Sequence, residues 1–354
     1  MANPISPIPA VSGQPVAVSK IESYLRESWE ASETSCRASL YNLVLYTQQE
    51  DSLESNTVIL SQIAREHACR ALLVCAPPHQ ARREARAWVT AHCAYDRESR
   101  SSICSEQITF VVRGFNPSDI ASIVFPHLLS DLPLVFWWQG DLNEHFTSPL
   151  SRHIDRFLFD SSGWANPRRC VLQLLDRHHR RHKPFILHDF TWARTFAFRL
   201  ALAACFEEPE ARTQLDEIQR VQVVHGPDGA AMAQLFLAWI ASRTGWICSG
   251  WKGQTLRLRS APGSQIECDL VARPEPGALL EVTLESPHGE FRLARGDRFV
   301  ERTSRLWGQA SRSLFPLQPD DSAALVSQIL GRGGNNAVYL AVLRFLRDHP
   351  CPRS

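Results

Sequence analysis

The sequence predicts an α/β protein in which a parallel-rich open sheet domain precedes a smaller α+β domain with an antiparallel sheet. The first observation behind this prediction is a pair of short apolar runs, residues 132–138 and 157–159, rich in aromatic residues and too short for helices. The polar segment between them, residues 142–156, is long enough for the crossover that joins two parallel strands. The three segments therefore predict strand, crossover, strand.

The second observation is a β-α-β pattern earlier in the chain. Residues 39–47 and 71–75 are apolar and strand-like, and residues 53–66 between them carry apolar positions at helical spacing. Residues 85–95 then alternate between small apolar and larger side chains, which is strand period, and residues 106–113 (EQITFVVR) form another strand pattern. We expect these last two to be a hairpin or neighbouring strands in the same sheet.

The third observation is a change of pattern in the carboxyl-terminal half. A short strand, VQVVHG, precedes an apolar helix at residues 230–243 that ends near Gly245, a favourable residue just after a helix. Alternating runs separated by Pro and Gly then predict an antiparallel sheet with one face packed on helices. These runs are residues 254–259, 265–271, 279–284 and 290–294, and two final helices are expected at 322–330 and 335–347.

A chain of 354 residues exceeds what one hydrophobic core usually supports, so two domains are expected. We place a flexible leader and a weak helix at residues 1–35. A Rossmann-like α/β domain follows at 36–185, and the α+β domain occupies 186–354.

The composition limits which binding partners and which cellular compartment are expected. A net charge of +1 gives no sign of the basic surface that binding to nucleic acid or an anionic membrane usually requires. The amino terminus lacks the pattern of a secretory signal, and no apolar run is long enough to span a bilayer. We expect a cytoplasmic protein that binds neither nucleic acid nor membrane.

The ten cysteines include no CxxC pair, and several lie among apolar neighbours. Free cysteine in such surroundings behaves as a small hydrophobic residue. We therefore expect all or nearly all ten thiols to be reduced in the native state.

Known catalytic motifs are absent from the sequence. It contains no phosphate loop of the GxxxxGK[ST] type, no GxSxG, no HExxH, and no GxGxxG after a strand. His178 and His182 would share a helical face, but four basic neighbours oppose a cation, so a solvated helix end is favoured over a metal site. No cofactor, metal or catalytic residue is predicted.

Candidate binding residues lie where the two central strands end. In open α/β sheets ligands and partners are met at the carboxyl ends of strands, which here carry Trp137, Trp138, Gly140 and Asp141. Successive strand residues point to opposite faces, so one tryptophan is expected in the core and the other at an interface or pocket. Ser161, in the turn DSSG, is either a helix cap, which we favour, or part of an anion site.

These residues also carry a resemblance to a known family. The sequence LPLVFWWQGD followed by a strand ending in DSS resembles the OpcA family of glucose-6-phosphate dehydrogenase assembly proteins. Three further stretches agree in order along the chain: CSEQITF at 104–110, DFTWAR at 189–194 and LAWIASRTGW at 237–246. The resemblance covers most of the chain beyond about residue 35, and the pieces are specific only when taken together.

The resemblance implies a non-enzymatic function. It predicts an assembly factor and allosteric activator that binds glucose-6-phosphate dehydrogenase, promotes its active oligomer and supports the oxidative pentose phosphate pathway. The alternative is an α/β enzyme or sugar-phosphate-binding protein with its pocket at the Gly140 and Ser161 turns. The surface around Trp138, Gly140 and Asp141 is the first candidate for the partner, and Trp192 with Arg194 is the next.

Overall fold

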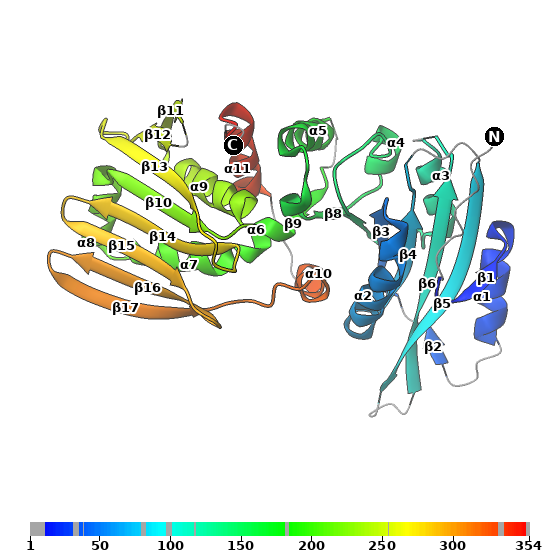
Figure 1. Cartoon of the computed structure of the whole chain (residues 1–354). Coiled ribbons are helices and arrows are strands. Elements are labelled where there is room, and N and C mark those ends of the chain that lie inside the picture. The colour runs from blue at the N-terminus through cyan, green and yellow to red at the C-terminus, as the bar shows by residue number, and fades with distance from the viewer. Residues whose placement is uncertain are drawn as a thin grey trace. The chain divides into compact units, whose positions relative to one another are not determined.

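The structure is a computed structural model in which the chain forms two compact units (Figure 1). The first unit comprises Met1–Asp160, Asp176–His188 and Asp321–Gly334, and the second comprises Ser161–Leu175, Asp189–Asp320 and Asn335–Ser354. The residues described are 11–30, 35–37, 39–78, 83–96, 101–116, 118–180, 184–253, 255–331 and 336–351, with backbone alone at 35–37, 94–96 and 101–103.

The first unit is built on a nine-stranded sheet. Along the sheet the order is β1 (Gln14–Val16), β5 (Glu84–Asp96), β6 (Ser101–Arg113), β4 (Cys69–Cys75), β3 (Tyr41–Thr47), β7 (Leu134–Trp138), β8 (Arg156–Phe159) and β9 (Ile186–Asp189), with β2 (Ser35–Arg37) beside β6. The strands from β6 through β4, β3 and β7 to β8 pair in parallel. Trp137 of β7 lies opposite Leu158 of β8, so the two central runs share one sheet, and the α/β prediction is confirmed.

The central strands of this sheet have nearly continuous apolar sequences because they are buried. Every residue of β4 and β7 is buried, which is typical of parallel strands covered on both faces. The helices of this unit are α1 (Ile21–Glu30), α2 (Leu53–Glu66), α3 (Asp119–Val124), α4 (Ser148–Ser151) and α10 (Ser322–Gly331). The predicted leader is structured in part, because residues 14–16 pair with β5.

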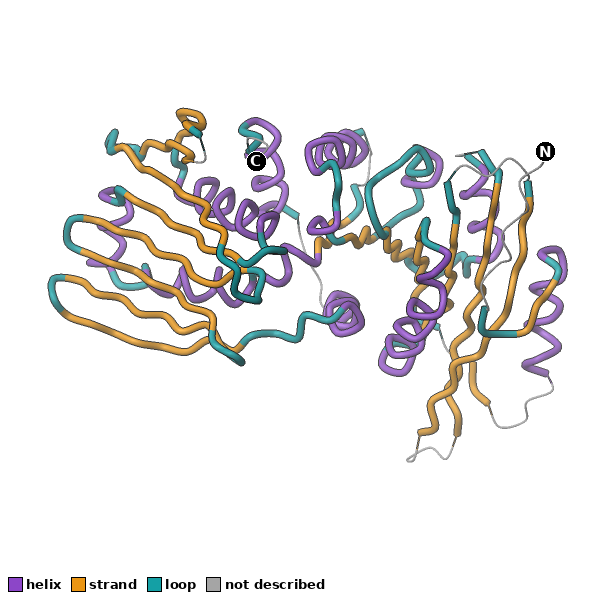
Figure 2. The backbone as a smooth tube through the Cα atoms, viewed as in Figure 1, coloured by secondary structure: helices purple, strands orange, loops and turns teal. Residues whose placement is uncertain are grey.

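The predicted hairpin is confirmed as the antiparallel pair β5 and β6, the longest strands in the tube view (Figure 2). Its register places Cys93 directly opposite Cys104, with the two Cα atoms 4.0 Å apart, and the two sulfurs form a disulfide. The expectation of reduced thiols is therefore wrong for this pair. The register that brings the two together depends on the whole ladder, and a spacing of 11 residues in the sequence carries no sign of it.

The second unit contains an eight-stranded, mostly antiparallel sheet, as predicted. Its order is β11 (Ile247–Lys252), β12 (Thr255–Arg259), β13 (Gln265–Ala272), β10 (Arg220–His225), β14 (Leu279–Ser286), β15 (Gly289–Arg295), β16 (Phe299–Leu306) and β17 (Gln309–Pro316). Its helices are α6 (Phe190–Arg194), α7 (Phe196–Cys205), α8 (Pro209–Thr213), α9 (Ala230–Thr244) and α11 (Ala337–Asp348), and α5 (Pro167–His179) begins here.

Helices pack against the apolar face of this second sheet. Helix α7 lies against β15, β16 and β17, whereas α9 lies against β10 and β13 and is itself covered by α11. Phe236 of α9 and Phe291 of β15 belong to the same buried cluster. Helix α9 ends at Gly245, whose φ of 70° is the left-handed conformation that glycine adopts without steric cost.

The boundary between the units is not the single division near residue 185 that the sequence suggested. Helix α10 follows the second sheet in the sequence but packs on α2 of the first unit. Leu325, Val326 and Leu330 of α10 are buried. The chain therefore returns to its first unit after building most of the second.

Candidate functional site

The turn after β3 occupies the position where dinucleotide-binding folds hold a pyrophosphate. Such folds place glycines and exposed backbone N–H groups at this turn. Here residues 47–52 read TQQEDS, without glycine and with two carboxylates, Glu50 and Asp51. Glu50 accepts two hydrogen bonds of 2.7 Å from the guanidinium of Arg113, which is buried. The turn thus lacks the glycines of a phosphate cradle, and it places the Asp51 carboxylate and the Glu50–Arg113 ion pair where the phosphate would lie.

A polar cluster fills the next part of the same sheet edge. The hydroxyl of Tyr46 lies 2.7 Å from Nδ1 of His145 and accepts a hydrogen bond of 3.2 Å from the amide of Asn143. Burial raises the pKa of Tyr46 and lowers that of His145, which favours the neutral form of both groups. The three side chains are linked to one another, and the Asn143 amide oxygen also accepts a hydrogen bond of 2.9 Å from the backbone N–H of His145, so the cluster is suited to holding the 143–145 loop.

Both tryptophans of the WW pair are core residues. Trp138 is fully buried and Trp137 is 3% exposed. The Trp138 ring stacks on Tyr46 with centroids 4.0 Å apart, and its indole N–H donates to the carbonyl of Asp141 at 3.0 Å. The expected division into one core and one interface tryptophan is therefore wrong, because helices and loops cover both faces of the parallel sheet.

The surface of this edge is formed by the turn that follows. Gly140 is exposed in the left-handed region with φ of 79°, and Asp141 is half-buried beside it. Behind the turn, the side-chain amides of Gln139 and Asn56 exchange two hydrogen bonds of 2.8 and 3.0 Å. The predicted residues Gly140 and Asp141 are thus brought together on a rigid, accessible turn supported by Trp138.

Ser161 belongs to the second unit and lies in a buried hub around Asp189. The Asp189 carboxylate accepts hydrogen bonds from the Ser161 hydroxyl at 2.6 Å, the Tyr339 hydroxyl at 2.7 Å and the Thr191 backbone N–H at 3.0 Å. Asp189 is 1% exposed and caps the amino-terminal end of α6. The Ser161 hydroxyl is already committed to a carboxylate, which disfavours an anion at the same place.

Trp192 and Arg194 lie on α6 in the second unit. The guanidinium of Arg199 stacks 3.6 Å above the Trp192 ring, and Tyr339 lies on the same indole with centroids 5.5 Å apart. Arg194 donates to the backbone carbonyl of Asp320 at 3.3 Å. Both candidate residues are half-buried, and their contacts hold the chain on either side of α10.

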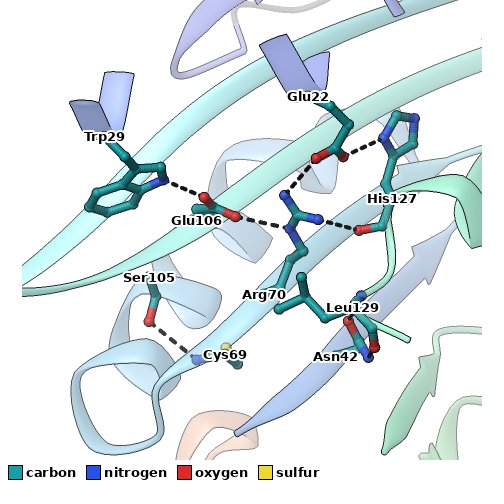
Figure 3. A network of polar contacts seen from close by, with 9 residues as sticks. All are labelled: Glu22, Trp29, Asn42, Cys69, Arg70, Ser105, Glu106, His127 and Leu129. Carbon is teal, nitrogen blue, oxygen red and sulfur yellow. Dashed lines mark hydrogen bonds and ion pairs between the residues drawn. The ribbon is translucent and has the colours of Figure 1, made fainter. Parts of the chain in front are cut away.

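An ionic network that we did not predict from the sequence attaches α1 to the first sheet (Figure 3). The guanidinium of Arg70 donates to Glu106 at 2.9 Å, to the His127 carbonyl at 3.0 Å and to Glu22 at 3.2 Å. Glu22 also lies 3.1 Å from Nδ1 of His127, and the Trp29 indole donates to Glu106. The Arg70 and Glu106 side chains are only 3% and 2% exposed, so each needs the other's charge.

One signal for this network was present in the sequence. Arg70 interrupts the otherwise apolar strand CRALLVC, and a buried arginine requires a carboxylate partner. The partner, Glu106, is 36 residues away on β6, and only the sheet order identifies it.

The described residues hold no group of three or more His, Cys, Asp or Glu side chains placed to bind a metal ion. His182, half of the histidine pair weighed from the sequence, lies outside the described residues. None of the helices within the described ranges combines the length and apolar character needed to cross a membrane.

Comparison with known families shows two consecutive matches. Residues 60–176 match the model described as the glucose-6-phosphate dehydrogenase subunit N-terminal domain, and residues 186–343 match the corresponding C-terminal domain. Proteins described as OxPP cycle protein OpcA are similar in sequence. Those from Synechococcus elongatus and Nostoc punctiforme are 25% and 28% identical over 305 residues, which cover 80% and 79% of this chain. The aligned regions span 68% and 65% of those relatives.

Solved structures with a related arrangement are oxidoreductases. KijD10, a 3-ketoreductase from Actinomadura kijaniata, is 10% identical with a TM-score of 0.46, covering 87% of this chain and 96% of its own. The aldose-aldose oxidoreductase from Caulobacter crescentus is 11% identical with a TM-score of 0.46, covering 88% and 96%. Values this low support no statement about activity. The two family matches together cover most of the chain, which therefore belongs to the OpcA family.

Proposed function

We propose that this chain is a non-enzymatic partner of glucose-6-phosphate dehydrogenase that acts in the cytoplasm, promotes the dehydrogenase's active oligomer and supports the oxidative pentose phosphate pathway. The observation that carries the proposal is the pair of matches, at residues 60–176 and 186–343, to models described as the two domains of a glucose-6-phosphate dehydrogenase subunit. The sequence relatives described as OxPP cycle proteins agree with it.

The chemistry of the first unit supports a binding role over catalysis. The turn after β3 carries Glu50 and Asp51 in place of a glycine-rich phosphate cradle. The Tyr46 and His145 pair, which resembles an acid and base, is buried and satisfied by Asn143. A reacting substrate would have to break that cluster before it could use either group.

For the interface we propose the turn at Gly140 and Asp141, with Trp138 supporting it from beneath. A turn held by a stacked tryptophan and an amide pair is preorganised, which reduces the entropy lost when a partner binds. The second candidate surface is that of Trp192 and Arg194 on α6.

The test measures activation of the dehydrogenase as the concentration of this chain is varied. Asp141→Ala is expected to raise the concentration needed for half-maximal activation about tenfold or more, because a charged interface group loses its partner. The control is Asp131→Ala, an exposed aspartate just before the amino-terminal end of β7. Trp138→Ala is unsuitable because truncating a buried tryptophan leaves a cavity.

The enzyme alternative, with a pocket at the Gly140 and Ser161 turns, is tested with the same preparation alone. Incubation with phosphorylated sugars and nicotinamide cofactors is expected to give no turnover. Turnover, or failure to co-elute with and activate the dehydrogenase, contradicts the proposed function. Activation that is unchanged by Asp141→Ala rejects only the Gly140 and Asp141 interface and directs the search to Trp192 and Arg194.

A further inference from the structure

The second unit contains a cavity of about 970 Å³ between the first turn of α5, the middle of α9 and the end of α11. Its size is at the upper end of the range for small-molecule sites, about 300–1,000 Å³. The described residues that line it all belong to the second unit. Gly140 and Asp141 belong to the first unit, so the cavity is a separate feature from the turn that they form.

Two polar side chains of the lining have no hydrogen-bond or ion-pair partner among the described residues. Arg168 of α5 is exposed and makes no hydrogen bond or ion pair within the described part of the chain. Gln234 of α9 is half-buried and makes no hydrogen bond there either. Because no described protein group bonds the Gln234 amide, it can pair with a polar group of a bound molecule.

The charge at the mouth of the cavity favours an anion. Arg168 and Arg169 occupy the first turn of α5, which has no acidic residue, although the helix dipole favours negative charge there. Arg347 adds a third guanidinium, but Asp348 holds it with hydrogen bonds of 2.8 and 3.0 Å. Arg168 is therefore the lining guanidinium available for bidentate binding of an anion.

The rest of the lining is apolar and extends inward. Val171, Leu346 and Pro350 contribute to the walls, and a smaller void of about 10 Å³ adjoins the cavity through Gln234, Leu346 and Cys351. Trp251 lines that void, and its buried indole nitrogen has no hydrogen-bond partner in the part of the chain that the structure describes. A buried donor without a partner is costly, so an acceptor from a ligand or an ordered water fits there.

We propose that this cavity binds a phosphorylated small metabolite. Arg168 holds the phosphate, the Gln234 amide bonds a hydroxyl or carbonyl of the body, and the apolar walls cover its carbon skeleton. The inference goes beyond the proposed function and does not depend on it, because the site requires no contact with the dehydrogenase.

Calorimetric titration of the full chain with glucose 6-phosphate and with AMP tests the proposal and separates sugar phosphates from nucleotides. One of the two is expected to bind, whereas glucose and adenosine, which lack the phosphate, are not. Arg168→Ala is expected to weaken binding about tenfold or more, the usual effect of losing a charge-assisted hydrogen bond. The matched control is Arg259→Ala, because Arg259 is also exposed and without a partner in the described structure of this unit.

A second measurement locates the ligand. Cys351 lines the cavity and is half-buried, whereas Cys248, which is half-buried too, lies outside its lining. Bound ligand is expected to slow alkylation of Cys351 and leave Cys248 unchanged. The proposal is overturned if neither phosphate binds at millimolar concentration, if Arg168→Ala binds as tightly as the parent chain, or if alkylation of Cys351 is not slowed. Because no dehydrogenase is present, failure here leaves the proposed assembly function standing.

Discussion

Tyr46 illustrates how single residues at the sheet edge serve the fold. Its hydroxyl is shared by His145 and Asn143 in a buried site, and its ring supports Trp138. The sequence placed Tyr46 in a strand but gave no indication of these partners, because His145 and Asn143 are about a hundred residues away. Side-chain partners at such separation depend on sheet order, which local patterns do not determine.

Replacing Tyr46 by Phe is expected to lower the free energy of unfolding by about 1–3 kcal/mol, because buried hydrogen-bonding groups of His145 and Asn143 lose their partner. Urea denaturation measures the change. The matched control is Tyr24→Phe on α1, a half-buried tyrosine whose hydroxyl makes no hydrogen bond in the described structure. Equal losses in the two variants would show that the hydroxyl cluster has no special role.

Arg70 is the second residue whose partners lie far away in sequence. Arg70→Met is expected to lower the free energy of unfolding by about 3–5 kcal/mol, because Glu106 remains buried without its counter-charge. The double variant Arg70→Met, Glu106→Leu removes both charges and should recover part of the loss, as measured by the same denaturation. This account would be contradicted if the double variant lost more free energy of unfolding than the two single variants lose together.

At the scale of elements, helix α1 is attached to the sheet partly through ionisable groups. Burial alone raises the pKa of Glu22, but hydrogen bonds to His127 and Arg70 and their charges hold it below its ordinary value. A lowered folded-state pKa contributes stability above the unfolded pKa, and this contribution is lost as pH falls through the folded value. Amide exchange in residues 21–30, corrected for the intrinsic rate, should therefore increase in acid, and Glu22→Gln should remove the pH dependence.

The β5 and β6 hairpin supplies another test. Unfolding the chain with a thiol-alkylating reagent is expected to give two fewer labels without reductant than with it, because Cys93 and Cys104 are joined. Mass spectrometry counts the labels, and the Cys93→Ser, Cys104→Ser variant should give equal counts in both conditions. Full labelling of the parent chain without reductant would show that the pair is reduced.

Elements were predicted best where one pattern dominates. The helix expected at residues 53–66 is found as α2, and the strands expected at 71–75 and 106–113 lie within β4 and β6. Strands β11, β16 and β17 were missed because they lie at or near the edges of the second sheet, where many residues are exposed. β17 is exposed at six of its eight residues, so no apolar alternation indicates it.

At the scale of the whole molecule, the two units are built from interleaved segments. A fragment of residues 1–188 is expected to be less stable than the same unit in the full chain, because the α2 surface that α10 covers becomes exposed. Chemical denaturation, monitored by amide exchange in β3 and β4, measures the difference in stability between the fragment and the full chain. Fusing residues 321–334 to the fragment through a flexible linker should restore stability, and a fragment that is already fully stable would show that α10 contributes little.

This interleaving also has a consequence for how the protein is made. A ribosome adds about 5–20 residues per second, so α10 leaves it roughly ten to thirty seconds after residue 160 has been joined. During that interval the partly finished first unit has an uncovered apolar surface on α2. The chain on the ribosome therefore passes through a period in which a chaperone has a defined place to bind, and that period ends only after residues 321–334 have been synthesised.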